Sequence, residues 1–288
     1  MSGNQNSWQL SETFDLKTIL DSILADVREE VAAAKLKSPL ADVRARLHDA
    51  PPVRDFAGAI GARFCLIAEI KERSPSVGPM RRENVRDAAA AYSESALVKA
   101  VSVLTNEHHF GMSIHRLAGI RATVPHPVLR KDFFISEYQI YEARAYGADA
   151  ILLMANVLDA PRLRGFHDLA RELGMEALFE IHTKEELDLI PRDARVIGIN
   201  SRKFKSQEGF VGTAGSSEKD FSLDMSAFDL VKHLPKNCIR VAESGIQPDT
   251  LQKVSESFHA ALVGTSLLRD PRGIQACLKD FESAAPCV

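Results

Sequence analysis

The segment CLIAEIKERSPS, residues 65–76, places two charged residues of opposite sign in an otherwise apolar stretch. Its first half, from Cys65 to Ile70, has the composition of a buried β-strand. Side chains in a strand alternate between its two faces, so Glu69 and Lys71 point to the same side. If that side is the interior, a carboxylate and an ammonium group lie together at the end of a buried strand. Such a pair could exchange protons with a bound molecule.

Polar residues also recur at the ends of other expected strands. Taken singly, each of them is more often a solvated strand end, but their coincidence on five strands predicts a site. In a parallel barrel the carboxyl ends of all strands meet at one face. Lysines and carboxylates held close together there shift each other's pKa values, which supports proton transfer in several steps. The residues of this set are Glu69, Lys71, Lys131, Glu180, Asn200, Arg202, Glu243 and Ser244.

The elements that must position these residues alternate along the chain. Eight short apolar segments are separated almost throughout by segments with helical spacing of their apolar residues. This alternation predicts a parallel sheet with helical crossovers. Eight units favour an α/β fold with a single (β/α)8 TIM barrel. An open doubly wound sheet is the alternative, but no GxGxxG motif follows the first strand. The expected strands are 65–71, 100–106, 127–133, 148–155, 176–182, 195–200, 239–245 and 260–268.

Two helices are expected ahead of the first strand, at 16–35 and 38–50, the second beginning with Ser38 as its cap. We therefore divide the chain into an N-terminal extension with helices, residues 1–50, and the barrel, residues 51–288. The extension is expected to pack on the barrel as part of one structural domain. In the simplest interpretation the helices bury the apolar end of the barrel.

Two segments could cover the mouth of the barrel. Residues 201–224 are rich in glycine, serine and charge and are expected to form a long loop. That loop is equally well explained as a surface insertion or as a mobile cover over the site. The polar N-terminal stretch carries the single tryptophan, Trp8, which we hypothesise to fold over the mouth.

Small residues predict a phosphate site after the last two expected strands. Gly245 follows one of them, and Gly264 and Thr265 close the other. Exposed backbone N–H groups beside a short helix start suit a phosphate dianion. Ser74, in the loop after the first strand, adds a hydroxyl group. Tight turns and close packing are the alternative explanation of the glycines.

The remaining motifs exclude some chemistries. No Ser-His-Asp signature is present, and the adjacent His108 and His109 do not have metal-ligand spacing, so we expect no metal. Three phenylalanines near the expected strand ends, Phe110, Phe133 and Phe204, could provide apolar walls for a flat ring.

Composition limits the partners. The net charge of -3 and the pI near 6.3 give no general attraction to nucleic acid or anionic membranes. The longest apolar runs are far shorter than the roughly 20 residues that span a bilayer. Four scattered cysteines without a CxxC pair are typical of a reduced cytoplasmic protein. We expect a cytoplasmic protein that binds a small molecule, with no nucleic-acid or membrane partner, as a monomer or a weak homodimer.

Together these motifs resemble the indole-3-glycerol phosphate synthase family of tryptophan biosynthesis. The resemblance covers about residues 15–283 and rests above all on LRKDF…EYQIYEARAYGADAILL and AEIK…SPS. The family's reaction closes the ring of carboxyphenylamino-deoxyribulose phosphate with loss of CO2 and water. It implies a carboxy-lyase that acts on a small phosphate ester and needs no metal or organic cofactor.

The resemblance also implies roles for the charged residues. Lys131 matches a general acid that activates the substrate carbonyl, and Lys71 matches a lysine that pairs with the substrate carboxylate. Glu69 and Glu180 match carboxylates that relay protons. The family's substrate-lining positions match Asn200, Arg202, Glu243 and Ser244; its phosphate holders match Ser74, Gly245, Gly264 and Thr265; its anthranilate pocket matches Phe110, Phe133 and Phe204.

The sequence differs from the family at two places, and three other functions remain as alternatives. Lys203-Phe204 replaces the common Asp-Leu, and the loop 203–222 is longer than usual. Phosphoribosylanthranilate isomerase would need a cysteine and an aspartate at the mouth, and Cys65 lies at the wrong end of its strand. A Schiff-base aldolase would use a desolvated lysine, for which Lys131 could qualify. A barrel that binds a phosphate ester without catalysis is the third alternative.

Overall fold

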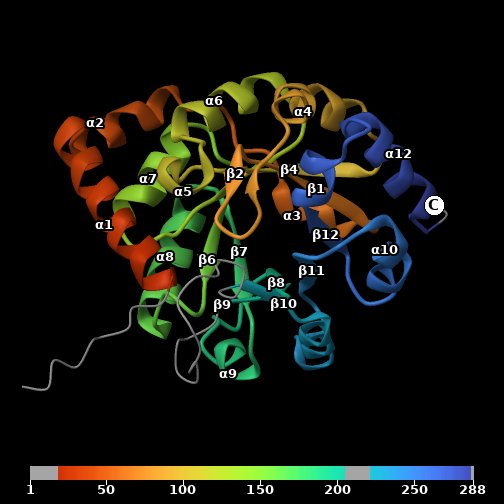
Figure 1. Ribbon diagram of the computed structural model, residues 1–288. Helices are drawn as coiled ribbons and strands as arrows, with labels where there is room; N and C mark the ends of the chain where they lie inside the picture. Colours follow the sequence, from red (N-terminus) through yellow and green to blue (C-terminus); the bar gives the residue numbers. More distant parts are fainter. Residues whose placement is uncertain (1–18, 205–220, 287–288) are drawn as a thin grey trace, which may run out of the picture.

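The computed structural model describes residues 19–204 and 221–286, apart from the side chains of residues 19, 203, 204, 221 and 222. Eight parallel strands close into a barrel in the order β1, β4, β5, β6, β7, β8, β11, β12, which confirms the predicted TIM-barrel fold (Figure 1). Their bounds are β1 Cys65–Ile70, β4 Val98–Leu104, β5 Val128–Lys131, β6 Ala150–Met154, β7 Glu176–Ile181, β8 Val196–Asn200, β11 Ile239–Glu243 and β12 Ala260–Val263.

Helices cover the outside of the barrel, so most strands are buried on both faces. The crossover between β7 and β8 contains a single helical turn, α9, which Thr183 caps and which ends shortly before Pro191. The region before β11 is a 3-10 helix, η2. The outer helices are α4 Arg82–Glu94, α6 Ile114–Thr123, α7 Glu137–Ala145, α8 Ala160–Glu172, α9 Lys184–Leu187, η2 Met225–His233, α10 Pro248–Ser255, α11 Thr265–Arg269 and α12 Ile274–Ala284.

The amino-terminal end of the barrel is closed by α3, Phe56–Gly61, which the sequence pattern did not predict. Phe56 and Ile60 are buried in the cluster that fills the barrel interior. The carbonyl of Ile60 accepts a weak hydrogen bond from the thiol of Cys65, the first residue of β1. Short though it is, this helix supplies the apolar plug that the two preceding helices were expected to supply.

The first helix, α1 Ile19–Lys37, instead lies at the mouth of the barrel beside α7. The hydroxyl of Tyr138 on α7 donates hydrogen bonds to the carbonyls of Ala34 and Ser38, 3.1 and 2.9 Å away. Val27 and Val31 are buried on the inner face of α1. The hypothesis about Trp8 lies outside the described residues.

The second expected helix differs from the prediction. It divides into α2, Leu40–Ala45, and a 3-10 turn, η1, Arg46–Asp49. Its N-cap is Pro39 rather than Ser38, because the carbonyl of Pro39 accepts the first hydrogen bonds, from the amides of Asp42 and Val43.

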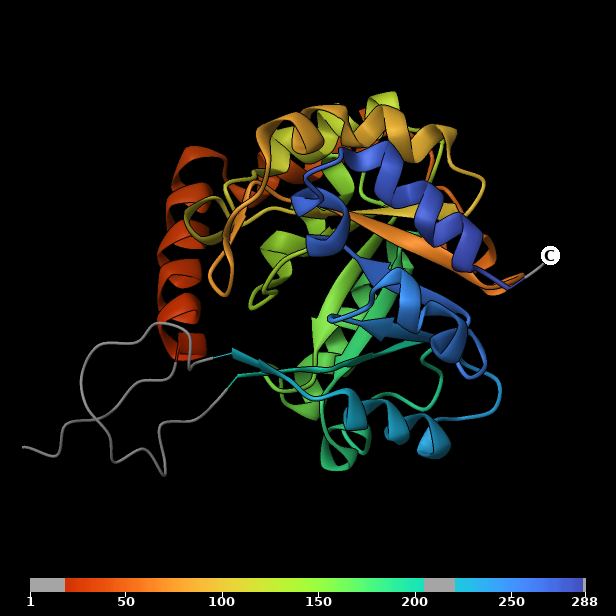
Figure 2. The same ribbon diagram turned by 45° about the vertical axis from the view of Figure 1, so that its right-hand side comes forward.

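Two hairpins flank the mouth. One joins β2 Arg73–Ser74 to β3 Gly78–Pro79, within the loop after β1. The other joins β9 Arg202–Phe204 to β10 Phe221–Leu223, antiparallel to each other, where the sequence predicted only a long loop. The strand pair forms at the two ends of that segment, while residues 205–220 lie outside the described part. Figure 2 shows α1 and the β2–β3 hairpin at the same side of the barrel.

Candidate active site

A cavity of about 450 Å³ opens at the carboxyl ends of the strands. It brings together all of the site residues predicted from the sequence except Phe204, whose side chain lies outside the described part of the chain. These residues are Glu69, Lys71, Ser74, Phe110, Lys131, Phe133, Glu180, Asn200, Arg202, Glu243, Ser244, Gly245, Gly264 and Thr265.

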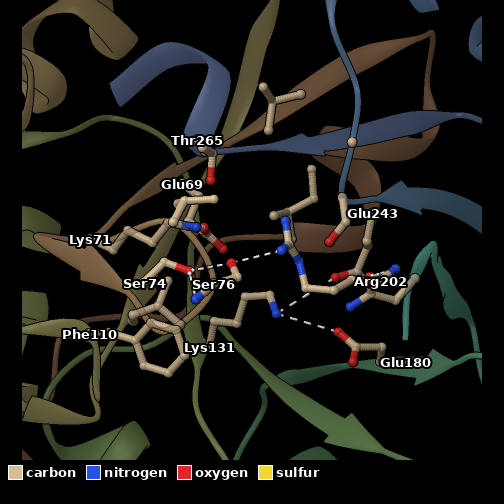
Figure 3. Close-up of a pocket in the computed structure, with 18 of the residues that line it drawn as sticks. Glu69, Lys71, Ser74, Ser76, Phe110, Lys131, Glu180, Arg202, Glu243 and Thr265 are labelled. Carbon is tan, nitrogen blue, oxygen red and sulfur yellow. Dashed lines mark hydrogen bonds and ion pairs between the residues drawn. The ribbon is translucent and has the colours of Figure 1, made fainter. Parts of the chain in front are cut away.

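Lys131, the last residue of β5, lies among buried carboxylates. Its Nζ is 3.4 Å from Oε2 of Glu180 on β7 and 3.9 Å from Oε2 of Glu243 on β11 (Figure 3). Burial disfavours the ammonium form, but the charges of Glu180, Glu243 and Glu69 outweigh it and raise the pKa of Lys131 above its ordinary value. Lys131 is therefore a stable cation on the floor of the cavity.

The two carboxyl groups near Lys131 have different proton affinities. Burial and the neighbouring Glu180 raise the pKa of Glu243 well above its ordinary value. Burial also opposes the ionisation of Glu180, but Lys131 and His182 outweigh it and lower the pKa of Glu180. Of the two carboxyl groups, Glu243 therefore has the higher proton affinity and Glu180 the lower. Two neighbouring carboxyls with separated pKa values can serve as base and acid.

A glycine that the sequence analysis did not select makes room for Glu243. A Cβ atom added to Gly198 on β8 would collide with the carboxylate of Glu243. The glycine lets that side chain lie across β8 toward Glu180. Its only sequence signal is a small residue inside a strand.

Glu69 and Lys71, the oppositely charged pair of the segment 65–76, also line the cavity. Lys71 Nζ is 2.5 Å from Oε1 of Glu69. Burial disfavours the carboxylate form, but Lys71 and Lys131 together lower the pKa of Glu69. A Cβ added to Gly264 would lie 2.5 Å from the same Oε1, so this glycine gives space to Glu69. The two buried charges, Glu69 on β1 and Lys71 directly after it, thus compensate each other at the mouth of the barrel.

Behind Glu180 lies a histidine that sequence reasoning missed. Nε2 of His182 is 3.6 Å from Oε1 of Glu180, and its Nδ1 is 3.3 Å from Oε2 of Glu186 on α9. Burial disfavours the imidazolium, but the hydrogen bond to Glu186 and the charge of Glu180 raise the pKa of His182. The alternation of LFEIH places His182 on the same side as Glu180, which was the available signal.

Arg202 extends over the cavity from β9. Its Nη1 donates to Oγ of Ser76 at 2.7 Å, and Oγ of Ser76 lies 2.9 Å from Oγ of Ser74 (Figure 3). The side chain of Asn200 accepts from the backbone N–H of Arg202 at 2.9 Å. These contacts join the loops after β1 and β8. Ser76 was not among the predicted residues, although the second serine of SPS lies beside the first.

Backbone turns at β11 and β12 shape the remaining wall. Ser244 has φ 70° and is the one non-glycine residue with positive φ in the described chain; Gly245 follows with φ 71°. Such strain is found at functional sites. The hydroxyl of Ser266 donates to the carbonyl of Ile246 at 2.8 Å and ties the two loops together. The first N–H groups of α11, which begins at Thr265, have no partner inside the helix.

Apolar side chains line the opposite part of the cavity. Phe110 and Phe133 are there as predicted, and Ile23 of α1 joins them. Ile23 was missed because an apolar residue on an amphipathic helix carries no sign of a ligand contact. Further lining residues outside the prediction are Leu104, Leu152, Met154, Leu223 and Leu262.

The chain was compared with known families and structures. The family profile described as indole-3-glycerol phosphate synthase matches residues 20–279. Relatives with that name include one from Kineococcus radiotolerans, 38% identical over 88% of this chain and 92% of the relative. Another, from Mycobacteroides abscessus, is 40% identical over 91% of this chain and 93% of the relative.

Solved structures share the fold at low identity. A chain from the tryptophan synthase a2b2 complex of Pyrococcus furiosus has a TM-score of 0.54 and 16% identity, covering 76% of this chain and 98% of its own length. The 3-hexulose-6-phosphate synthase of Salmonella typhimurium also has a TM-score of 0.54, with 10% identity, covering 77% of this chain and 97% of its own. These similarities indicate a shared barrel alone.

Proposed function

The chain belongs to the indole-3-glycerol phosphate synthase family, and on this basis we propose how its cavity performs the ring closure. The protein is a lyase of tryptophan biosynthesis. It converts 1-(2-carboxyphenylamino)-1-deoxyribulose 5-phosphate into indole-3-glycerol phosphate, CO2 and water. The observation that supports the proposal most is the position of Lys131, a buried cation between Glu180 and Glu243.

Lys131 is the general acid in this proposal. Negative charge develops on the substrate's carbonyl oxygen while the new carbon–carbon bond forms, and a buried ammonium stabilises it. The same ammonium donates a proton to that oxygen and turns it into a hydroxyl group. Lys131 is protonated beforehand, because the surrounding carboxylates raise its pKa.

The carboxylates act during ring closure and in the steps that follow it. A cationic iminium charge develops on the anilino nitrogen as the ring forms, and the ionised Glu180 offsets it. Loss of CO2 leaves its electron pair in the ring and cancels the iminium charge, and the hydroxyl leaves as water with a proton from Lys71, the second lysine of the cavity. Glu180 accepts the proton that restores the aromatic indole, while Lys71, paired with Glu69, faces the substrate carboxylate.

Different parts of the cavity suit the phosphate and the anthranilate ring at the two ends of the substrate. The phosphate would be held by Ser74 and the turns at Gly245, Gly264 and Thr265, with Arg202 reaching the same loop through Ser76. The anthranilate ring would lie between Phe110 and Phe133. Asn200 and Ser244 line the space between these ends.

The rival chemistries fit this geometry poorly. A Schiff-base lysine must lose its proton to attack a carbonyl, and the surrounding carboxylates act against that loss at Lys131. An isomerase cysteine would have to reach the mouth. Cys65 is buried at the other end of β1, where burial raises the pKa of its thiol to about 12.

We also propose that the protein works as a cytoplasmic monomer. The described cysteines, Cys65, Cys238 and Cys277, are free and buried, as is common in reducing compartments. In the described part of the chain, no helix combines the length and apolar character that crossing a membrane requires.

The test is indole fluorescence after addition of carboxyphenylamino-deoxyribulose phosphate to the native protein, to Lys131→Met and to the control Lys253→Met. Lys253 lies on α10, away from the cavity. The signal should rise for the native protein and the control, and stay flat for Lys131→Met. If the native protein binds the substrate tightly but indole fluorescence does not rise, the catalytic proposal is refuted. Equal rates for Lys131→Met and the native protein would refute the role of Lys131.

A further inference from the structure

A group of possible metal ligands lies on the rim of the mouth, outside the cavity. It consists of Asp26 on α1 and of His108 and His109 on the short helix α5, Glu107–Phe110. One ligand atom from each residue lies within 4.8 Å of the others. The histidines alone do not have metal-ligand spacing in the sequence, and Asp26 is 83 residues away from His109.

The distances suit a bound ion of small radius. Nε2 of His109 is 2.9 Å and Nε2 of His108 is 3.9 Å from the same atom, Oδ2 of Asp26. In a tetrahedral zinc site with bonds of about 2.0 Å, ligand atoms lie about 3.3 Å apart. The two distances from Oδ2 of Asp26 lie on either side of that value. Small side-chain rotations of His108, which is largely exposed, would bring its nitrogen into range.

A second carboxylate lies near the group. Glu30 lies one turn after Asp26 on α1, and its Oε2 accepts from Nδ2 of Asn106 at 2.8 Å. The carboxyl of Glu30 also accepts from the backbone N–H of His108. Two carboxylates on one face of α1 thus point at the loop that carries both imidazoles. Glu30 or a water molecule could complete four ligands.

We propose that Asp26, His108 and His109 form a binding site for a divalent transition-metal ion, with Zn²⁺ as its best match. Two imidazole nitrogens and one carboxylate oxygen are borderline ligands that select Zn²⁺, Co²⁺, Ni²⁺ or Cu²⁺ over Mg²⁺ and Ca²⁺. The ion would bridge α1 and α5, which lie side by side in Figure 1. Both elements also line the cavity, through Ile23 and Phe110. The ion would hold the covering helix onto the mouth and takes no part in the ring closure.

The experiment is calorimetric titration of the purified full chain with ZnCl2, and with CoCl2 as an optical probe, each against MgCl2. The native protein should bind one Zn²⁺, and Co²⁺ should give the visible absorption of a nitrogen- and oxygen-ligated ion. Asp26→Asn, His108→Ala and His109→Ala should each lower the affinity at least tenfold. The matched controls Asp42→Asn and His233→Ala replace exposed residues on α2 and η2 and should bind as the native protein does.

A second measurement guards against misfolded variants and places the ion. The affinity of a variant is compared only if its circular dichroism spectrum without metal matches that of the native protein. Hydrogen exchange of the native protein should slow in residues 19–37 when Zn²⁺ is added, and should not change in Asp26→Asn. Zn²⁺ binding that persists in all three variants would overturn the proposal. So would the absence of binding by the native protein. Neither result depends on the ring-closing activity, so the proposed function is tested separately.

Discussion

The Nζ atom of Lys131 on β5 lies 3.4 Å from Oε2 of Glu180 on β7, although β6 separates the two strands in the barrel. The contact crosses the mouth side of β6, where both residues reach the carboxyl end of their strands. Because both groups are buried, dissolved salt screens their attraction far less than it screens the attraction within a surface ion pair. It raises the pKa of Lys131 and lowers that of Glu180, while burial and the charge of Glu180 raise the pKa of Glu243.

This arrangement predicts unequal effects of neutralising the two glutamates. Glu180→Gln removes an ionised base and should lower kcat by roughly 10²–10⁴-fold, the usual contribution of such a group. Burial and Glu180 raise the pKa of Glu243, so a neutral, hydrogen-bonding glutamine imitates it more closely, and Glu243→Gln should lower kcat by about tenfold at most. Steady-state assays of both variants at neutral pH measure the difference. Equal losses in kcat, or a larger loss for Glu243→Gln, would contradict the separated pKa values.

Gly198→Ala should disturb the site although it changes no charged residue. The new methyl group meets the carboxylate of Glu243, which must then move or displace β8. We expect kcat to fall at least tenfold and the free energy of unfolding to drop by about 1–3 kcal/mol. The control is Gly165→Ala on α8, where an added Cβ meets nothing within 4 Å. It should raise the unfolding free energy by about 0.4–1 kcal/mol and leave kcat unchanged. Normal kcat in Gly198→Ala would show that Glu243 does not need this space.

The pair of His182 and Glu186 predicts a pH-dependent stability. The folded-state pKa of His182 is raised, so its proton stabilises the fold. That contribution is complete below the unfolded pKa of about 6.5 and disappears as pH rises through the folded pKa. Urea unfolding at several pH values should therefore show the largest loss of stability in His182→Asn at pH 5.5 and a smaller loss at high pH. His48→Asn, on the exposed turn η1, is the control. A deficit that grows with pH would reverse the assigned direction.

Several features could be read from the sequence because they depend on local order. Strands buried on both faces consist of continuous apolar residues, so β6 and β7 were recognisable as runs. Polar residues at the ends of such runs, including Glu69, Lys131 and Glu180, stood out against this background. The closed barrel then brought them to one mouth, as its topology requires.

Other features had no local signal. The plug α3 has only six residues, and its apolar pattern is too short to be distinguished from a loop. The first helix could be predicted, yet its place at the mouth depends on Tyr138, about a hundred residues further along the chain. Ile23 therefore became a cavity residue only through packing.

The sequence by itself determined the order of strands and helices and the chemical types at each strand end, because these follow from residue periodicity and composition. Only the tertiary structure decided which charges face each other at 3.4 to 3.9 Å and which of the two carboxyl groups has the higher pKa. It also decided that Asp26 meets two histidines from a distant loop. The physical reason is that Coulomb interactions and desolvation depend on distance and burial in space. Neither quantity is encoded by separation along the chain.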